Sequence, residues 1–201
     1  MSDKNSRETD LAYIIHGVVI ATGFTYIPSV KSKPYLISLL SLLAISILDW
    51  HLFYKMDDFL EKKKGSGYYT ADLWIIDYVI LACYAICFKT ISNNSITSFL
   101  LSITTHFKII FFFSIGIGVL SSIWWIIIHV RFLCRIRCLS VILGLIFYSL
   151  IPFVVYFMTK ANFVIGTTLL LLDFLIYPSL IQYVKLLYEK SDSKGEKKNV
   201  N

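Results

Sequence analysis

Two apolar segments, YLISLLSLLAISILDWHLFYK (35–55) and TADLWIIDYVILACYAICFKTI (70–91), decide the fold of this chain. Each is long enough to cross about 30 Å of hydrocarbon, which takes roughly 20 helical residues. The loop that joins them, residues 55–69, carries four lysines, and lysine clusters stay on the cytoplasmic side of a membrane during insertion. The sequence therefore predicts a transmembrane hairpin whose connecting loop faces the cytoplasm.

The overall composition also indicates a membrane protein. The chain has 201 residues, of which 57% are hydrophobic, and a mean hydropathy of +0.70. Soluble domains contain about 45–50% apolar residues, so a soluble core would not absorb this surface. The net charge of +6 sits in loops and tails between apolar runs. The expected counter-charges are therefore anionic lipid headgroups or a cytosolic protein, with no direct binding of nucleic acid.

Further apolar runs before and after the hairpin complete an all-α membrane bundle of about six transmembrane helices. These runs cover residues 11–30, 107–130, 139–159 and 162–184. The apolar run that begins at residue 96 is too long for one span, so its first part, residues 96–105, is interpreted as an interfacial lead-in.

Polar segments flank this bundle on both sides. Residues 1–10 form a polar N-terminal segment, residues 11–188 the helix bundle, and residues 189–201 a lysine-rich cytoplasmic tail that we expect to be mobile. With six spans, the side that holds both termini carries 14 lysines and arginines, and the opposite side carries 5. This bias predicts cytoplasmic termini in the inner (plasma) membrane of a cell.

Small residues recur every four positions in two of the predicted spans. Gly17 and Ala21 belong to such a stripe in the first span, and Ser114, Gly118 and Ser122 form one in the fourth. Small-residue stripes let helix backbones approach closely in a membrane. We expect these positions to pack helices, including those of neighbouring copies in a homo-oligomer.

Ionisable residues inside the spans are the sequence's main pointers to function, because each is costly in hydrocarbon. His16, Asp49, His51 and Asp77 fall in the cytoplasmic third of their spans. Asp49 and His51 point about 200° apart on a helix, so a shared site requires several helices to converge. Such a site would be a polar vestibule, a metal site or a proton relay. The alternative is that each residue only bonds to a neighbouring helix or to interfacial water.

Asp173 differs from these residues because it lies near the middle of its span. No lysine, arginine or histidine occurs at its depth, so it is expected either to hydrogen-bond to a serine or threonine of another helix or to line a pore in an oligomer. Pro178, five residues further on, removes a backbone donor and favours a kink nearby.

Familiar catalytic and cofactor motifs are missing from the sequence. There is no G-x-S-x-G, H-E-x-x-H, P-loop or G-x-G-x-x-G pattern, so we expect neither an enzyme nor a cofactor. Cys83 and Cys87 lie in a span, and Cys134 and Cys138 in a basic loop. Without a nearby histidine this C-x3-C spacing is poor for zinc, so no metal is expected and the thiols are predicted to be free.

Basic loops at the predicted cytoplasmic face suggest a docking surface for an acidic partner. The residues expected to contribute are Lys62, Lys63, Lys64, Arg131, Arg135 and Arg137. The alternative is that these charges only set the topology of the chain.

In its size, its 35–91 hairpin and its basic loop KKKGSGYY, the chain resembles the membrane subunits of bacterial anti-phage defence systems, most nearly that of the Kiwa system. The resemblance implies an oligomer of the inner membrane that senses phage arrival and works with a soluble, DNA-binding cytosolic partner.

Three functions are therefore expected, in this order. The first is a non-enzymatic membrane sensor or anchor subunit that acts with a cytosolic partner, in bacterial anti-phage defence if the resemblance holds. The second is an oligomeric ion channel or pore. The third, a membrane-embedded enzyme, requires His16, Asp49 and either His51 or Asp77 to converge around a cavity large enough for a lipid.

Overall fold

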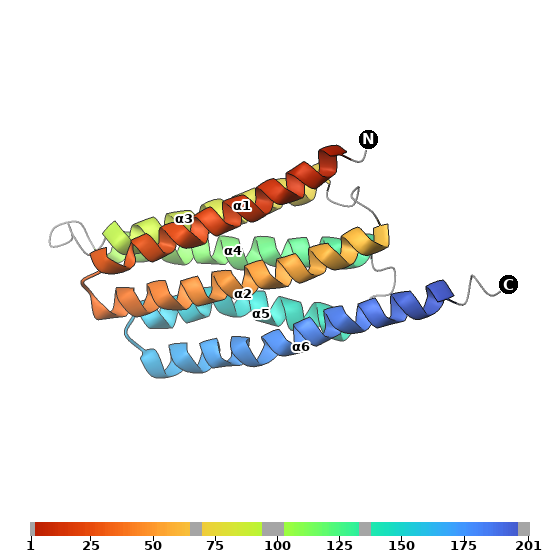
Figure 1. Ribbon diagram of the computed structural model, residues 1–201. Coiled ribbons are helices and arrows are strands. Elements are labelled where there is room, and N and C mark those ends of the chain that lie inside the picture. The colour runs from red at the N-terminus through yellow and green to blue at the C-terminus, as the bar shows by residue number, and fades with distance from the viewer. Residues whose placement is uncertain (1–2, 65–69, 94–102, 133–137, 197–201) are drawn as a thin grey trace.

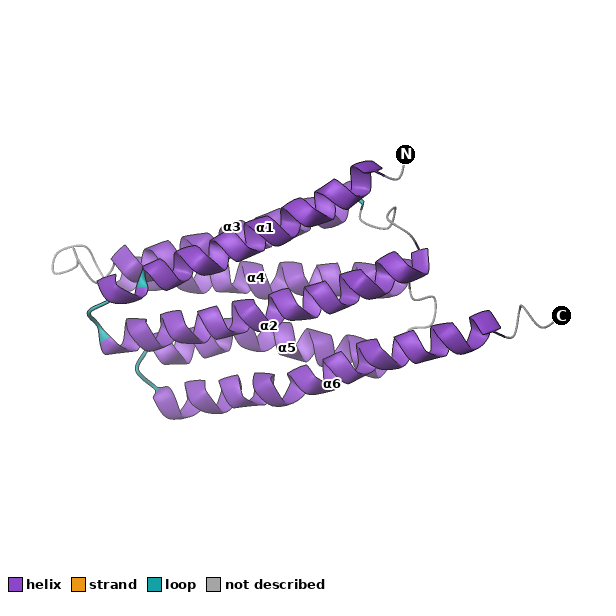
Figure 2. Ribbon diagram, in the orientation of Figure 1, coloured by secondary structure: helices purple, strands orange, loops and turns teal. Residues whose placement is uncertain are grey.

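The computed structural model describes residues 3–64, 70–93, 103–132 and 138–196, and nearly all of them are helical (Figure 2). Within these residues the helical elements, in chain order, are α1 Asp3–Thr25, the short 3-10 helix η1 Ile27–Ser29, α2 Lys33–Lys64, α3 Ala71–Asn93, α4 Ile103–Phe132, α5 Cys138–Thr159 and α6 Phe163–Glu196.

Six of the described helices, α1 to α6, are long and apolar enough to cross a membrane. This confirms the predicted all-α, six-span architecture and indicates a multi-pass membrane protein. Large apolar side chains on the outer faces agree with contact to lipid: Val164 is 79% exposed, Leu175 72% and Phe112 70%. A soluble protein rarely exposes so many apolar side chains in continuous faces.

Several helices extend beyond the predicted spans. Helix α2 continues to Lys64, so part of the predicted 55–69 loop is helical. Good helix formers and the Lys62–Asp58 ion pair, four residues apart, favour this extension. Helix α6 continues to Glu196, so the first part of the predicted lysine-rich tail, residues 189–196, is helical, and its mobility stays a prediction.

The polar segment 1–10 is also largely helical, because α1 begins at Asp3. Helix α4 begins at Ile103, so the end of the predicted 96–105 lead-in belongs to the fourth helix. The rest of that lead-in, residues 96–102, lies outside the described residues.

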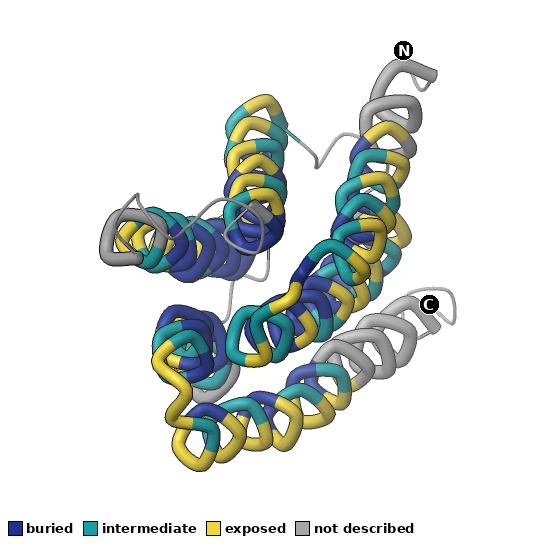
Figure 3. Tube along the Cα trace, turned by 90° about the vertical axis from the view of Figure 1, so that its left-hand side faces the viewer, coloured by how far each residue is buried: buried dark blue, intermediate teal, exposed yellow. Residues whose placement is uncertain are grey.

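The helices form an antiparallel bundle with both chain termini at one end (Figure 1). We call this the termini end, and the end with the α1–α2 connection the far end. Helix α1 packs on α2 and α3. Helix α3 packs on α4, α4 on α5, and α5 on α6. Helix α2 lies against α5 and α6. Buried positions turn towards the middle of the bundle and exposed ones outward (Figure 3).

The core of the far half is apolar. Leu39, Leu42 and Leu43 of α2 meet Phe88 and Ile91 of α3 there, and none of these side chains is more than 2% exposed. Buried serines in this half are hydrogen-bonded within the protein, as when Ser38 Oγ donates to the carbonyl of Pro34 at 2.9 Å and lies 3.1 Å from Thr159 Oγ1. The far half therefore contributes packing, and the chemistry of the core lies elsewhere.

Candidate functional site

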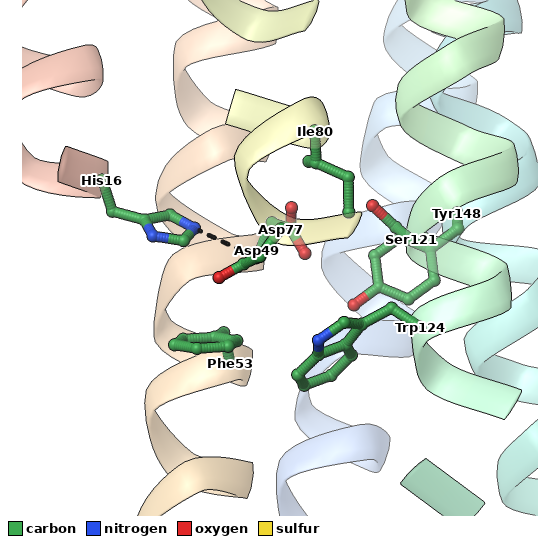
Figure 4. Close-up of a pocket in the computed structure, with 8 residues that line it drawn as sticks. All are labelled: His16, Asp49, Phe53, Asp77, Ile80, Ser121, Trp124 and Tyr148. Atoms are coloured by element: carbon green, nitrogen blue, oxygen red, sulfur yellow. Dashed lines mark ion pairs between the residues drawn. The ribbon is translucent and has the colours of Figure 1, made fainter. Parts of the chain in front are cut away.

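Three ionisable side chains from three helices converge inside the bundle. His16 of α1, Asp49 of α2 and Asp77 of α3 are 5%, 9% and 5% exposed. His16 Nε2 lies 3.9 Å from Asp77 Oδ1 (Figure 4). Asp77 is six residues after the start of α3, or about 9 Å from its termini end. We call these three residues the triad site.

The histidine of the triad site is fixed in one orientation. His16 Nδ1 lies 2.9 Å from the carbonyl oxygen of Ala12. Because a carbonyl only accepts hydrogen bonds, Nδ1 carries a hydrogen, and Nε2 is the nitrogen that faces Asp77. An unprotonated Nε2 and an ionised carboxylate are both acceptors. The facing pair is therefore favourable only when a further proton sits on one of them.

Tyrosine hydroxyls surround the second carboxyl group. Tyr84 Oη donates to Asp49 Oδ2 at 3.3 Å, and the Tyr148 hydroxyl also lies within hydrogen-bonding reach of Asp49. Both tyrosines are almost completely buried. Asp49 therefore receives hydroxyl donors from α3 and α5, while the imidazole from α1 faces Asp77.

A small cavity lies among these groups. Its volume is about 10 Å³, roughly the size that holds one water molecule. The residues that line it are His16, Asp49, Phe53, Asp77, Ile80, Ser121, Trp124 and Tyr148. Figure 4 shows the polar side chains of this set turned towards a common space between the helices.

Two polar atoms that α4 brings to the cavity have no hydrogen-bond partner in the described part of the chain. They are Ser121 Oγ and Trp124 Nε1. Their residues are only 2% and 4% exposed, so bulk water does not satisfy them. Buried polar atoms without partners are rare in native proteins and often mark a bound water or ion.

An aromatic side chain separates the cavity from the termini end. Phe53 stacks on His16 with ring centroids 5.3 Å apart, and it also contacts Trp124. Its termini side meets the edge of Tyr13, whose hydroxyl donates to Asp57, a buried carboxyl group one turn beyond Phe53 on α2. A third carboxyl group, that of Asp57, therefore lies close to the triad site, on the other side of the Phe53 ring.

Charge is not balanced within the triad site. The cavity is lined by two carboxyl groups and one imidazole, and by no lysine or arginine. If the imidazole is charged and both carboxyls are ionised, the site carries a net charge of −1 in a buried position. A net charge in a buried position is costly, so the site favours taking up a positive charge.

The other predicted intramembrane residues do not join this site. His51, two residues from Asp49, is exposed and hydrogen-bonds to Tyr177 of α6, as the predicted opposite direction implies. Asp173 is 0% exposed, and both of its carboxyl oxygens lack a hydrogen-bond partner among the described residues. The expected bond from Asp173 to a serine or threonine is therefore not found there.

The predicted basic docking surface is described only in part. Arg131 donates to Asp72 Oδ2 at 2.7 Å and to Thr70 Oγ1 at 2.7 Å, which ties the end of α4 to the start of α3. Lys62 pairs with Asp58 at 2.9 Å. The side chains of Lys63 and Lys64, and the whole of Arg135 and Arg137, lie outside the described residues.

The two small-residue stripes have different surroundings. A side chain at Gly118 would come within 2.6 Å of the Tyr148 backbone oxygen, so this glycine permits close contact between α4 and α5. Ser114, one turn earlier, is fully buried, and Ser122 donates to the Gly118 carbonyl. Gly17 faces open space and Ala21 is exposed. Packing of this first stripe against another copy stays a prediction.

Sequence reasoning named the three ionisable residues but missed their neighbours. Tyr84 follows Asp77 by seven residues, or two helical turns, and Phe53 follows Asp49 by four. Both spacings place residues on one helix face, so a search for companions of each carboxyl group would have found them. Nothing in the sequence of α4 distinguishes Ser121 from Ser122.

No group of three or more histidine, cysteine, aspartate or glutamate side chains in the described ranges has the geometry to hold a metal ion. Comparison with protein-family models, curated proteins and solved structures finds no match to this chain.

Proposed function

We propose that this protein is a non-enzymatic, multi-pass membrane sensor subunit that takes up a small cation at the triad site and signals at the termini end. The observation that carries the proposal is the buried charge imbalance: two carboxyl groups and one imidazole share a cavity of about 10 Å³ between five helices. Ionisable side chains are costly to place inside a membrane span, so those that occur there usually have a function.

The size of the cavity favours a sensor over an enzyme. It accepts about one water molecule and is far below the roughly 300–1,000 Å³ of pockets for organic ligands. The membrane-embedded enzyme required the triad residues to surround a space of lipid size. In the described part of the chain, His16, Asp49 and Asp77 do converge, but the cavity among them is only about 10 Å³.

The position of the site favours a sensor over a pore. Within the described residues, the core between the triad site and the far end is mostly apolar, and its polar groups are a few buried serines and the carboxyl group of Asp173. Asp173, the residue proposed to line a pore, is buried inside the single chain and is 0% exposed. A cation that enters from the termini end therefore meets a closed apolar core.

Signalling at the termini end requires a surface there that binds a partner. Helix α2 is suited to connect the triad site to that surface. Asp49 lies in the middle of α2, and the same helix ends at the lysines proposed to dock a cytosolic partner. Because the helix is about 48 Å long and continuous, a change of packing at Asp49 can alter the position of Lys62. A cytosolic protein with an acidic surface is the partner that fits this basic end, and the resemblance to anti-phage membrane subunits implies a soluble cytosolic partner.

The test compares the two ends of α2 in the full chain reconstituted in lipid nanodiscs. A fluorophore is attached at Lys62→Cys or, as the matched control, at Lys33→Cys at the far end of the same helix. Both native side chains are exposed. Cys134→Ser and Cys138→Ser remove competing thiols in both proteins. We expect acidification to change the fluorescence at position 62 more than at position 33, and Asp77→Asn to abolish the difference.

Equal responses at the two positions, or a response at position 62 that survives Asp77→Asn, would contradict the proposed signalling. Vesicles that hold the unlabelled protein provide a second readout. Steady proton or sodium flux that Asp77→Asn abolishes would favour a channel over a sensor.

A further inference from the structure

The hydrogen-bond requirements of the cavity identify its ligand more closely than the proposed function does. This inference rests on that function and concerns the nature of the cation. Trp124 Nε1 only donates hydrogen bonds, so the unpartnered indole requires an acceptor in the cavity. A metal cation repels an N–H donor, whereas the oxygen of a water molecule accepts from it.

Ser121, which lies three residues before Trp124 on the same face of α4, has the complementary property. Ser121 Oγ is unpartnered, 2% exposed and turned into the same space, and a hydroxyl both accepts and donates. One water in a cavity of about 10 Å³ accepts from Trp124, bonds to Ser121 and donates to a carboxylate. Buried waters make about three such bonds.

A water molecule does not remove the charge imbalance, but a proton does. The bond from His16 to the Ala12 carbonyl leaves Nε2 facing Asp77, and this contact needs an extra proton on one of the two groups. Asp49 is the second carboxyl group, and one more proton at the site brings its net charge from −1 to 0.

We propose that the triad site binds one water molecule and one exchangeable proton, which Asp49 and Asp77 share through the cavity. On uptake, a hydronium ion gives its proton to an ionised carboxylate, an O–H bond forms on the carboxyl group, and water is released or stays in the cavity. No electron is transferred, and no metal takes part.

The groups that face this proton come from all five helices around the cavity. They are the His16 imidazole of α1, the Asp49 carboxyl of α2, Asp77 and Tyr84 of α3, the neutral Ser121 and Trp124 of α4, and Tyr148 of α5. Asp57 and Tyr13 form the next polar pair towards the termini end, beyond Phe53. The termini end is therefore the side from which the proton enters.

The first experiment measures the melting temperature of the full chain in phosphatidylcholine nanodiscs between about pH 5 and pH 8, the range over which histidine-linked sites commonly titrate. Losing the shared proton leaves a buried negative charge, so the melting temperature is expected to fall as the pH rises. Sodium chloride and choline chloride at equal concentration are expected to give the same curve.

Variants separate this site from other buried groups. Asp77→Asn, which keeps the side-chain shape, is expected to remove the part of the pH dependence that belongs to the cavity. Asp173→Asn removes only the separate contribution of that buried carboxyl group, which lies outside the cavity. Ser121→Ala is expected to reduce the pH dependence by removing a partner of the water. Ser122→Ala is the matched control, because its hydroxyl donates to the Gly118 carbonyl instead.

A spectroscopic readout on the unmutated fold guards against variants that fail to fold. In histidine-labelled protein, one ring whose nitrogen signals titrate with the melting transition, and which His16→Gln removes, supports the proposal. Specific stabilisation by sodium, or a pH dependence that Asp77→Asn leaves intact, would overturn it. Specific stabilisation by sodium would reject the proton as the ligand but would leave the sensor proposal standing. If the melting curves show the proton site and the fluorophore at position 62 does not respond, the sensor proposal alone is rejected.

Discussion

The two halves of the bundle core are built from the same helices but have different chemistry. In the termini half, His16, Asp49 and Asp77 meet around a cavity with two unpartnered polar atoms. In the far half, residues such as Leu42 and Phe88 form a mostly apolar core. In the far half, mainly apolar side chains are sufficient to pack the same helices. The ionisable groups of the termini half are therefore not needed for packing.

Removing the imidazole is expected to have the largest effect on this comparison. His16→Leu leaves two buried carboxyl groups facing one another without a base, and the loss of one partner of a buried pair costs about 3–5 kcal/mol. The free energy of unfolding of the detergent-solubilised chain measures this change. His51→Leu is the control, because His51 is exposed and its hydrogen bond goes to Tyr177, outside the triad site. Equal losses at the two histidines would show that position 16 has no special role.

A truncation in the far half is expected to be nearly as costly but independent of pH. Leu42 is 0% exposed, and shortening a buried leucine to alanine costs about 2–5 kcal/mol because a cavity remains. Leu42→Ala should lower the melting temperature by the same amount at every pH, whereas Asp77→Asn should change its pH dependence. Melting curves across a pH series distinguish the two halves. A pH-dependent loss in Leu42→Ala would break the comparison.

The close contact between α4 and α5 gives a smaller expected effect. Gly118→Ala places a methyl group 2.6 Å from the Tyr148 backbone oxygen, and overpacking of this kind costs about 1–3 kcal/mol. The shift of α5 also moves Tyr148 relative to Asp49, so the variant should weaken the pH response. Gly17→Ala is the control, since its side chain meets nothing within 4 Å. Thermal unfolding of both variants tests the contrast, and equal destabilisation would contradict it.

The smallest expected effect lies at the surface of the termini end. The ion pair of Arg131 with Asp72 has side chains that are 42% and 45% exposed, so its contribution is limited to about 0.2–1 kcal/mol and is screened by salt. Arg131→Gln should therefore reduce stability slightly at low ionic strength and hardly at all at high ionic strength. A loss that is unaffected by salt would indicate a structural role beyond this ion pair.

Sequence alone predicted the number of spans and three members of the site. Each span has about 20 apolar residues, and a charged residue stands out against them, as Asp49 and Asp77 do. The 200° separation of Asp49 and His51 also predicted that only one of them would face a given neighbour. These features depend on one helix at a time, which is why sequence periodicity reveals them.

The rest of the site depends on how helices pack against one another. Ser121 and Ser122 are chemically identical in the sequence, but only Ser121 faces the cavity, because of the rotation of α4. The contact of Tyr148 with Asp49 likewise requires α5 to lie beside α2. The ends of α2 and α6 were missed for a different reason: polar helix formers extend these helices beyond the apolar runs that mark a span.

The most direct test of the account is a double-mutant cycle between His16 and Asp77, whose facing atoms are 3.9 Å apart. The free energies of unfolding of the wild type, His16→Leu, Asp77→Asn and the double variant are measured at one pH in the same detergent. If the two side chains form one coupled site, the double variant loses at least about 1 kcal/mol less than the sum of the single losses. Losses that add to within about 0.5 kcal/mol would contradict a shared site in the termini half.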